Sequence, residues 1–201
     1  NNLEVELAEL LVKTIPSAEM VKFSKNASDV CAASVRLARY YTKKDLVICY
    51  GYHGFHDWYI GSTDKSYGIP SNVKNLTKTF DYGDIEGLEK IIKKNKGKIA
   101  AIIMEPVIGQ RQNCSYDDKN NKRKFMKPCA QCPQARTLKK VKKLAKSAGA
   151  VFILDECISG FRFSEGGAQD YFGVEPDLSI FGKGATNGMP LGILSGKKKI
   201  M

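Results

Sequence analysis

Apolar residues occur along this chain in short unbroken runs, which lie between longer stretches where apolar positions recur at helical spacing. The runs are of strand length and carry few charged side chains, so they predict buried strands. They cover residues 21–23, 46–50, 98–104, 151–154, 178–181 and 191–195. None approaches the roughly 20 apolar residues that a membrane-spanning helix needs, so we expect no membrane partner.

Helical patterns alternate with these runs. Apolar residues at helical spacing predict helices over residues 30–41, 85–95, 134–147 and 168–172. Residues 26–29 are a helix start signal, Asp84 caps the second helix, and Gly149 ends the third. We expect residues 51–83 to be rich in loops and residues 109–133 to form a polar, irregular insertion. The alternation predicts an α/β domain with a largely parallel sheet.

Composition narrows the class of protein. The chain has 201 residues, of which 43% are apolar and 26% charged, which is typical of a globular domain. The net charge of +11 raises the possibility of nucleic-acid binding. However, only 6 of the 32 basic residues are arginine, the preferred reader of phosphates and base edges. A lysine-rich solvated surface is therefore the favoured interpretation, and a basic nucleic-acid-binding module is the alternative.

The six cysteines indicate the compartment. They lie at positions 31, 49, 114, 129, 132 and 157, which is not a dense disulfide framework, so we expect a reducing cytoplasm. Cys49 and Cys157 lie in or beside apolar strands, as small core residues do. Cys129 and Cys132 have zinc-ligand spacing, but only Cys114 is near, and a structural zinc site usually has four ligands. We therefore predict an exposed insertion loop and no metal.

Two residues that follow strands carry candidate chemistry, because ligands of open α/β sheets bind at the carboxyl ends of the strands. Asp155 follows the apolar run 151–154, where a carboxylate needs a cationic partner. Lys183 lies between Gly182 and Gly184, and a lysine in such a loop can form a Schiff base with a carbonyl group. The simpler alternatives are an aspartate that caps its own loop and a surface turn lysine.

Two further features involve a helix start and an aromatic turn. Ser28, in the sequence Asn-Ala-Ser-Asp at 26–29, either helps to seat a phosphate or acts as an ordinary N-cap. Tyr52 in the Gly-Tyr-His-Gly sequence at 51–54 offers an aromatic face to a planar ligand, or packs within a turn. A phosphate seat, an aromatic face, a carboxylate and an amine are together the set that pyridoxal phosphate requires.

Five segments resemble motifs of the class III aminotransferases, and they occur in the same order along the chain. These enzymes depend on pyridoxal phosphate. The segments are residues 52–54, 105–106, 150–162, 177–184 and 188–192, and the resemblance runs from about residue 21 to residue 201. The nearest branch is similar to glutamate-1-semialdehyde 2,1-aminomutase. This resemblance implies the large, cofactor-binding domain of a fold-type I enzyme, spanning residues 1–201.

The resemblance assigns the catalytic roles to two residues. Lys183 would bind the cofactor as a Schiff base and later shuttle protons, while Asp155 would keep the pyridine nitrogen protonated. Tyr52 would stack on the ring. An inactive homologue that only binds the cofactor is a further alternative, and the presence of both Lys183 and Asp155 counts against it.

The resemblance also completes the cofactor-binding set. Ala27 and Ser28 would donate to the phosphate in place of the Gly-Thr pair common in the family, and His53 and Glu105 belong to the Tyr-His-Gly and Glu-Pro motifs. Many ω-aminotransferases of this class carry a glutamate a few residues after the Glu-Pro motif. This chain lacks that glutamate and has Gln110 nearby, which favours the aminomutase-like branch.

The expected activity follows from this resemblance. The enzyme would move an amino group between an amine donor and a carbonyl acceptor, or within a single small-molecule substrate. Residues 51–59 are also similar to relatives linked to surface-sugar biosynthesis. We expect a homodimer that does not bind nucleic acid. We also expect the chain to be a fragment that lacks the family's N-terminal segment and C-terminal small domain.

Overall fold

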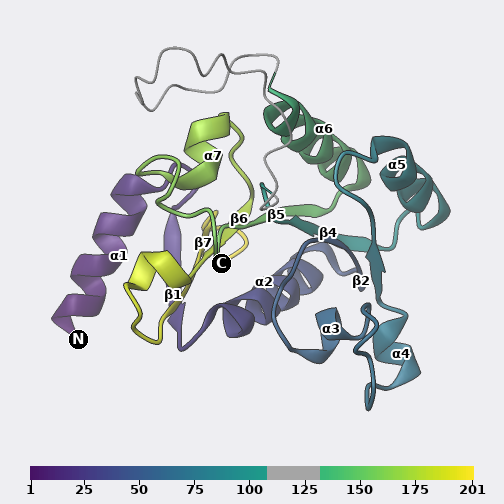
Figure 1. Ribbon diagram of the computed structural model, residues 1–201, viewed down its shortest axis with the longest axis horizontal. Helices are drawn as coiled ribbons and strands as arrows, with labels where there is room; N and C mark the ends of the chain where they lie inside the picture. The colour runs from purple at the N-terminus through teal and green to yellow at the C-terminus, as the bar shows by residue number, and fades with distance from the viewer. Residues whose placement is uncertain (108–131) are drawn as a thin grey trace, which may run out of the picture.

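The computed structural model describes residues 1–107 and 132–201, and its centre is one seven-stranded sheet. The strands lie in the order β1-β7-β6-β5-β4-β2-β3. Within this sheet β7 is antiparallel to both of its neighbours, β1 and β6, and the remaining pairings are parallel. The strand bounds are β1 Met20–Ser24, β2 Leu46–Tyr50, β3 Thr77–Thr79, β4 Ile99–Met104, β5 Val151–Asp155, β6 Leu178–Phe181 and β7 Gly192–Gly196. The predicted α/β class with a largely parallel sheet is confirmed (Figure 1).

Helices cover both faces of the sheet (Figure 1). Their bounds are α1 Asn2–Thr14, α2 Ala27–Thr42, α3 Asp57–Ile60, α4 Ser71–Lys74, α5 Ile85–Lys94, α6 Pro133–Ala148 and α7 Gly167–Phe172. One face packs against α2, and the opposite face packs against α5, α6 and α7. Neighbouring strand residues alternate between the two cores, as Ile102 and Ile103 do in β4. This two-sided burial explains why the central strands are apolar throughout.

Local signals set several element ends as expected. The Asp84 side chain accepts from the Gly87 N–H and caps α5, and Gly149 ends α6 in the left-handed conformation with φ 61°. The sequence patterns missed α1, which packs at the β1–β7 end of the sheet through Leu7 and Leu11. They also missed α3, α4 and β3 within the stretch expected to be loop-rich.

The predicted insertion at 109–133 falls largely outside the described residues, as do Gln110, Cys114 and Cys129. Its last two residues are described: Cys132 is the N-cap residue of α6, and Pro133 is the first residue of that helix. Within residues 1–107 and 132–201, no helix has the length and apolar character needed to cross a bilayer.

Candidate functional site

The predicted site residues come from the carboxyl ends of four neighbouring strands. Tyr52 and His53 follow β2, Glu105 follows β4, Asp155 ends β5, and Lys183 follows β6. The sheet order β6-β5-β4-β2 places these strand ends side by side (Figure 1). All four strands run in the same direction, so their functional side chains gather at one edge of the sheet.

Asp155 is the most completely enclosed of the candidate catalytic groups, with 3% of its surface exposed. Its Oδ1 accepts the backbone N–H of Cys157 at 3.0 Å, so it does cap its own loop, as the simpler alternative predicted. Its Oδ2 lies 2.7 Å from His53 Nδ1 and 3.5 Å from Cys31 Sγ. A buried carboxylate with three such neighbours is held in one orientation.

His53 connects Asp155 to the end of β2. The ring is buried, its Nε2 lies 3.0 Å from the Tyr50 carbonyl oxygen, and its Nδ1 faces Asp155. A carbonyl oxygen can only accept, so Nε2 carries a hydrogen and donates it. The contact between Nδ1 and Asp155 then needs one more proton, placed either on the ring or on the carboxyl group.

Glu105 fixes the loop that carries Tyr52. Its Oε2 accepts the backbone N–H of Tyr52 at 3.0 Å, and burial raises the pKa of the Glu105 carboxyl group. Gly51, at φ +99°, lies against this carboxylate so closely that a side chain there would overlap it. The Tyr52 ring meets the Tyr59 ring edge-to-face at 5.6 Å and is 59% exposed. One face of the tyrosine is therefore available for a planar ligand.

The residue that caps the N-terminus of α2 is not the one that the sequence suggested. Asn26, not Ser28, caps the helix: its side chain accepts the Asp29 N–H at 3.0 Å. The N-cap interpretation of Ser28 was therefore wrong, because Ser28 already lies inside the first turn. Among the described residues the Ser28 hydroxyl has no hydrogen-bond partner, and Gly54 packs directly on it. The Ser28 hydroxyl and the N–H groups of Ala27 and Ser28 remain available to an anion, whereas the Asp29 N–H is taken by Asn26.

Lys183 opens a short 3-10 helix, Lys183–Thr186, and its Nζ donates to Cys157 Sγ at 3.2 Å. Burial on its own lowers the pKa of Lys183, but Cys157, Asp155 and Glu105 outweigh it, and the pKa is raised. Burial also raises the pKa of the Cys157 thiol, so this thiol is neutral near pH 7. The negative charge that favours the ammonium form therefore comes from the two carboxylates.

Gly182 brings the lysine loop against the start of α2. A Cβ added at Gly182 would lie 3.1 Å from Ala27 Cβ and 3.3 Å from Cys157 Sγ. The Asp155 loop, the lysine loop and the first turn of α2 therefore meet at this glycine. Together with the loop that carries Tyr52, these segments present a buried carboxylate, an amine, an exposed aromatic face and a helix N-terminus, and this donor set fits pyridoxal phosphate.

Sequence reasoning missed three residues of this region. Cys31 lies three positions after Ser28, so helical spacing places both on the same side of α2, and this signal would have found it. Cys157 was interpreted as a core residue but contacts Lys183. Glu156 is fully buried, and its carboxylate accepts the backbone N–H groups of Ala168 and Gln169 at the start of α7.

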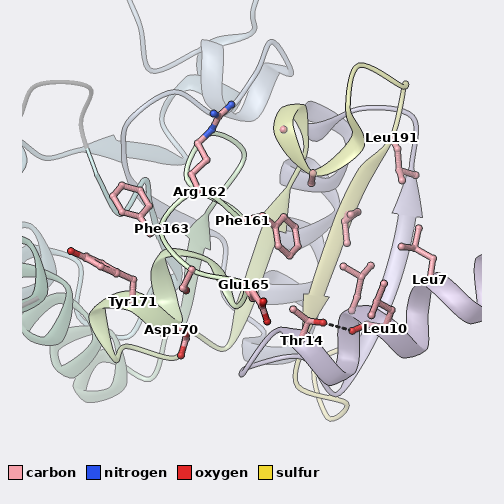
Figure 2. Close-up of a pocket in the computed structure, with 15 residues that line it drawn as sticks. Leu7, Leu10, Thr14, Phe161, Arg162, Phe163, Glu165, Asp170, Tyr171 and Leu191 are labelled. Atoms are coloured by element: carbon pink, nitrogen blue, oxygen red, sulfur yellow. Dashed lines mark hydrogen bonds between the residues drawn. The ribbon is translucent and has the colours of Figure 1, made fainter. Parts of the chain in front are cut away.

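A cavity of about 890 Å³ lies beside the lysine loop and is not lined by any predicted site residue. Leu7 and Leu10 of α1 line one side and Phe161 lines the other (Figure 2). Gly184 and Ala185, which follow Lys183, are among its lining residues. Its lining lacks the carboxylate, the amine and the helix N-terminus described above, so it is distinct from the candidate cofactor site.

Comparisons with known proteins point to one family. The family model for class-III aminotransferases matches residues 130–201. Glutamate-1-semialdehyde 2,1-aminomutases from Ignicoccus hospitalis and Archaeoglobus fulgidus are 36% and 38% identical over 100% and 99% of this chain. A solved structure described as a transaminase with PLP bound is similar over 100% of this chain, with a TM-score of 0.82 and 25% identity. The chain spans about half of each relative, 46% in all three cases.

Proposed function

The chain belongs to the class-III aminotransferase family, and on that basis we propose that it forms the cofactor-binding part of an enzyme that moves amino groups with pyridoxal phosphate. One observation carries the proposal. A buried carboxylate, Asp155, ends β5, and a glycine-flanked amine, Lys183, follows the adjacent parallel strand β6. Cys157 contacts both residues. This places an anion and a nucleophilic amine at the same edge of the sheet.

Four groups of this chain would hold the cofactor. Asp155 would face the pyridine nitrogen, and Tyr52 would stack on the ring. Ser28 and the neighbouring N–H groups, including that of Ala27, would bind the phosphate at the α2 N-terminus. Lys183 would attach covalently to the aldehyde. When bound, pyridoxal phosphate supplies an electron-withdrawing ring that stabilises negative charge at the carbon next to the transferred nitrogen.

The surrounding residues position these groups. His53, Cys31 and the Cys157 N–H hold Asp155 in place. Its carboxylate would then be positioned to keep a proton on the pyridine nitrogen. Glu105 holds the backbone of the loop that carries Tyr52. When it is not attached to the cofactor, the Lys183 Nζ would take a proton from the substrate carbon and return it at another carbon.

The names of the relatives support the aminomutase branch, so an intramolecular amino shift on glutamate 1-semialdehyde is the activity to test first. Transfer between a separate amine donor and carbonyl acceptor remains the second candidate, which the likeness to a solved transaminase supports. The link to surface-sugar biosynthesis stays a prediction. A homodimer in the cytoplasm is part of the proposal. The nucleic-acid-binding alternative is not favoured by any of the relatives described above.

Borohydride reduction followed by peptide mass spectrometry tests the proposal. The purified full-length protein, loaded with pyridoxal phosphate, should yield one pyridoxyl-modified peptide, with the adduct on Lys183. Lys183→Ala should remove the adduct, whereas Lys90→Ala, on the exposed face of α5, should leave it unchanged. An adduct on a different lysine, or none at all, would show that the assignment is wrong. Bleaching of the visible absorbance by one candidate amine, and not by others, would identify the donor.

A further inference from the structure

Cys31, His53 and Asp155 bring a thiol, an imidazole and a carboxylate together in the interior. Their ligand atoms all lie within 4.8 Å of one another, and all three residues are buried. They come from α2, from the loop after β2 and from the end of β5. In the described part of the chain, this is the one group of three such residues found at this spacing. Sulfur, nitrogen and oxygen donors of these types are the ligands that zinc takes in proteins.

The orientation of His53 favours a cation between the ring and Asp155. Nε2 donates its hydrogen to the Tyr50 carbonyl oxygen, so in neutral His53 the lone pair of Nδ1 points at Asp155 Oδ2, only 2.7 Å away. Two lone pairs at this distance repel unless a proton or a metal ion lies between them. A ligating histidine usually donates its other N–H to a carbonyl or a carboxylate, as His53 does to Tyr50.

One pair of donor atoms, Cys31 Sγ and Asp155 Oδ2, already has the separation expected in a tetrahedral site. With Zn–S and Zn–O bonds of about 2.3 and 2.0 Å, the 3.5 Å between Cys31 Sγ and Asp155 Oδ2 corresponds to an angle at the metal of about 110°. The 2.7 Å between His53 Nδ1 and Asp155 Oδ2 would have to open by about half an ångström, within the reach of a side-chain rotation. Three protein ligands leave a fourth position for water.

We propose that Cys31, His53 and Asp155 bind a zinc ion when pyridoxal phosphate is absent, and that zinc and the cofactor exclude one another at Asp155. On binding, Zn–S, Zn–N and Zn–O bonds form, the S–H bond of Cys31 breaks, and the proton held between His53 and Asp155 is displaced, so that two protons pass to solvent. Hard cations such as Mg²⁺ are disfavoured because a thiol and an imidazole are poor ligands for them. The exclusion rests on the proposed function, in which Asp155 serves the pyridinium nitrogen, since one carboxylate cannot neutralise both cations.

Cobalt titration of the full-length protein, stripped of pyridoxal phosphate, tests the metal site. Co²⁺ should bind at one equivalent with a near-ultraviolet thiolate-to-metal absorption band, and Zn²⁺ should displace it. Cys31→Ser should abolish the band and weaken zinc binding at least tenfold. Cys49→Ser is the matched control, because Cys49 is equally buried in the same core but is not in the cluster. If Cys31→Ser does not fold, Asp155→Asn should likewise weaken zinc binding, because an amide is a poor zinc ligand.

The insertion cysteines are the competing source of a thiolate signal. The double variant Cys129→Ser/Cys132→Ser should keep the band. A band that survives Cys31→Ser and disappears in this double variant would overturn the proposal, as would the absence of binding in the stripped protein.

Competition tests the second half of the proposal. One equivalent of Zn²⁺ should slow covalent attachment of pyridoxal phosphate at Lys183 at least tenfold, and preloading with pyridoxal phosphate should suppress the cobalt band. Simultaneous binding of both would overturn the exclusion. The two hypotheses fail in different ways. Normal cofactor attachment without any cobalt band refutes only the metal site, and a cobalt band in a protein that never binds pyridoxal phosphate refutes only the proposed function.

Discussion

Replacing Asp155 by asparagine should separate the chemical role of this residue from its structural role. The asparagine oxygen can accept the Cys157 N–H in place of Oδ1, which does so at 3.0 Å. The amide NH₂ can donate to His53 Nδ1, whose partner lies at 2.7 Å, while Nε2 continues to donate to Tyr50. Only the weak thiol contact from Cys31 loses its acceptor. We therefore expect the free energy of unfolding to change by less than about 1 kcal/mol.

Asp155→Ala should behave differently because it removes every acceptor at this position. The partly buried Cys157 N–H and the buried His53 ring would each lose a partner. Each unsatisfied group costs about 1–3 kcal/mol, so about 2–6 kcal/mol of stability should be lost. In both variants the pyridine nitrogen loses its anion. That loss should cost about 3–5 kcal/mol in the transition state, or roughly 2–4 powers of ten in turnover.

Urea unfolding without cofactor, turnover, and borohydride trapping at Lys183 measure these effects separately. Asp155→Asn should be stable, should still attach the cofactor, and should be nearly inactive. If it is destabilised as much as Asp155→Ala, then His53 is a charged imidazolium that needs the carboxylate, and the hydrogen-bond argument is wrong. Turnover within tenfold of wild type would instead show that Asp155 does not serve the ring nitrogen.

Three further perturbations test other parts of the site. Ser28→Asp should weaken pyridoxal phosphate binding at least tenfold. It should leave the melting temperature of the cofactor-free protein nearly unchanged, because Asn26 and not Ser28 caps α2. If the variant retains cofactor through dialysis as well as wild type does, the phosphate binds elsewhere. The pKa of Lys183 is raised, so the amine is protonated at neutral pH. The rate of cofactor attachment should therefore rise with pH, by about tenfold per pH unit while the pH stays below that pKa. Stopped-flow rates that stay flat from pH 7 to 9 would contradict this. Glu156→Gln should cost about 1–3 kcal/mol in urea unfolding, because even in the better orientation its NH₂ group faces the buried Ala168 N–H, while the Ser159 hydroxyl can turn to accept. A loss below about 1 kcal/mol would mean that this region rearranges.

Much of the sheet could be predicted from the sequence because the central strands are buried on both faces. The run 46–50 coincides with β2, and the runs at 98–104, 151–154, 178–181 and 191–195 match β4 to β7 to within one residue at each end. The caps at Asp84 and Gly149 also follow from local chemistry, since each satisfies backbone groups only a few residues away. Family-specific motifs at the strand ends supplied the roles of Asp155 and Lys183.

Elements without an apolar run could not be found in this way. β3 consists of Thr77, Lys78 and Thr79 and exists because its backbone pairs with β2. In α1, Leu3, Val5 and Leu10 are largely exposed, so its apolar pattern does not show which face packs on the sheet. In both cases the deciding interaction is with a partner distant in sequence, which no local pattern contains.

The same reason limits what the sequence determined about the site. Residue types and motif order identified a carboxylate, an amine, a ring and a helix start. Only the tertiary structure brought His53 and Cys31 against Asp155, across 102 and 124 positions of chain. Such contacts depend on the order of strands in the sheet and on the seating of α2 upon it. The strand order and the position of α2 are set by the packing of two buried cores. A sequence motif gives the identity of the side chains but not the distances between them.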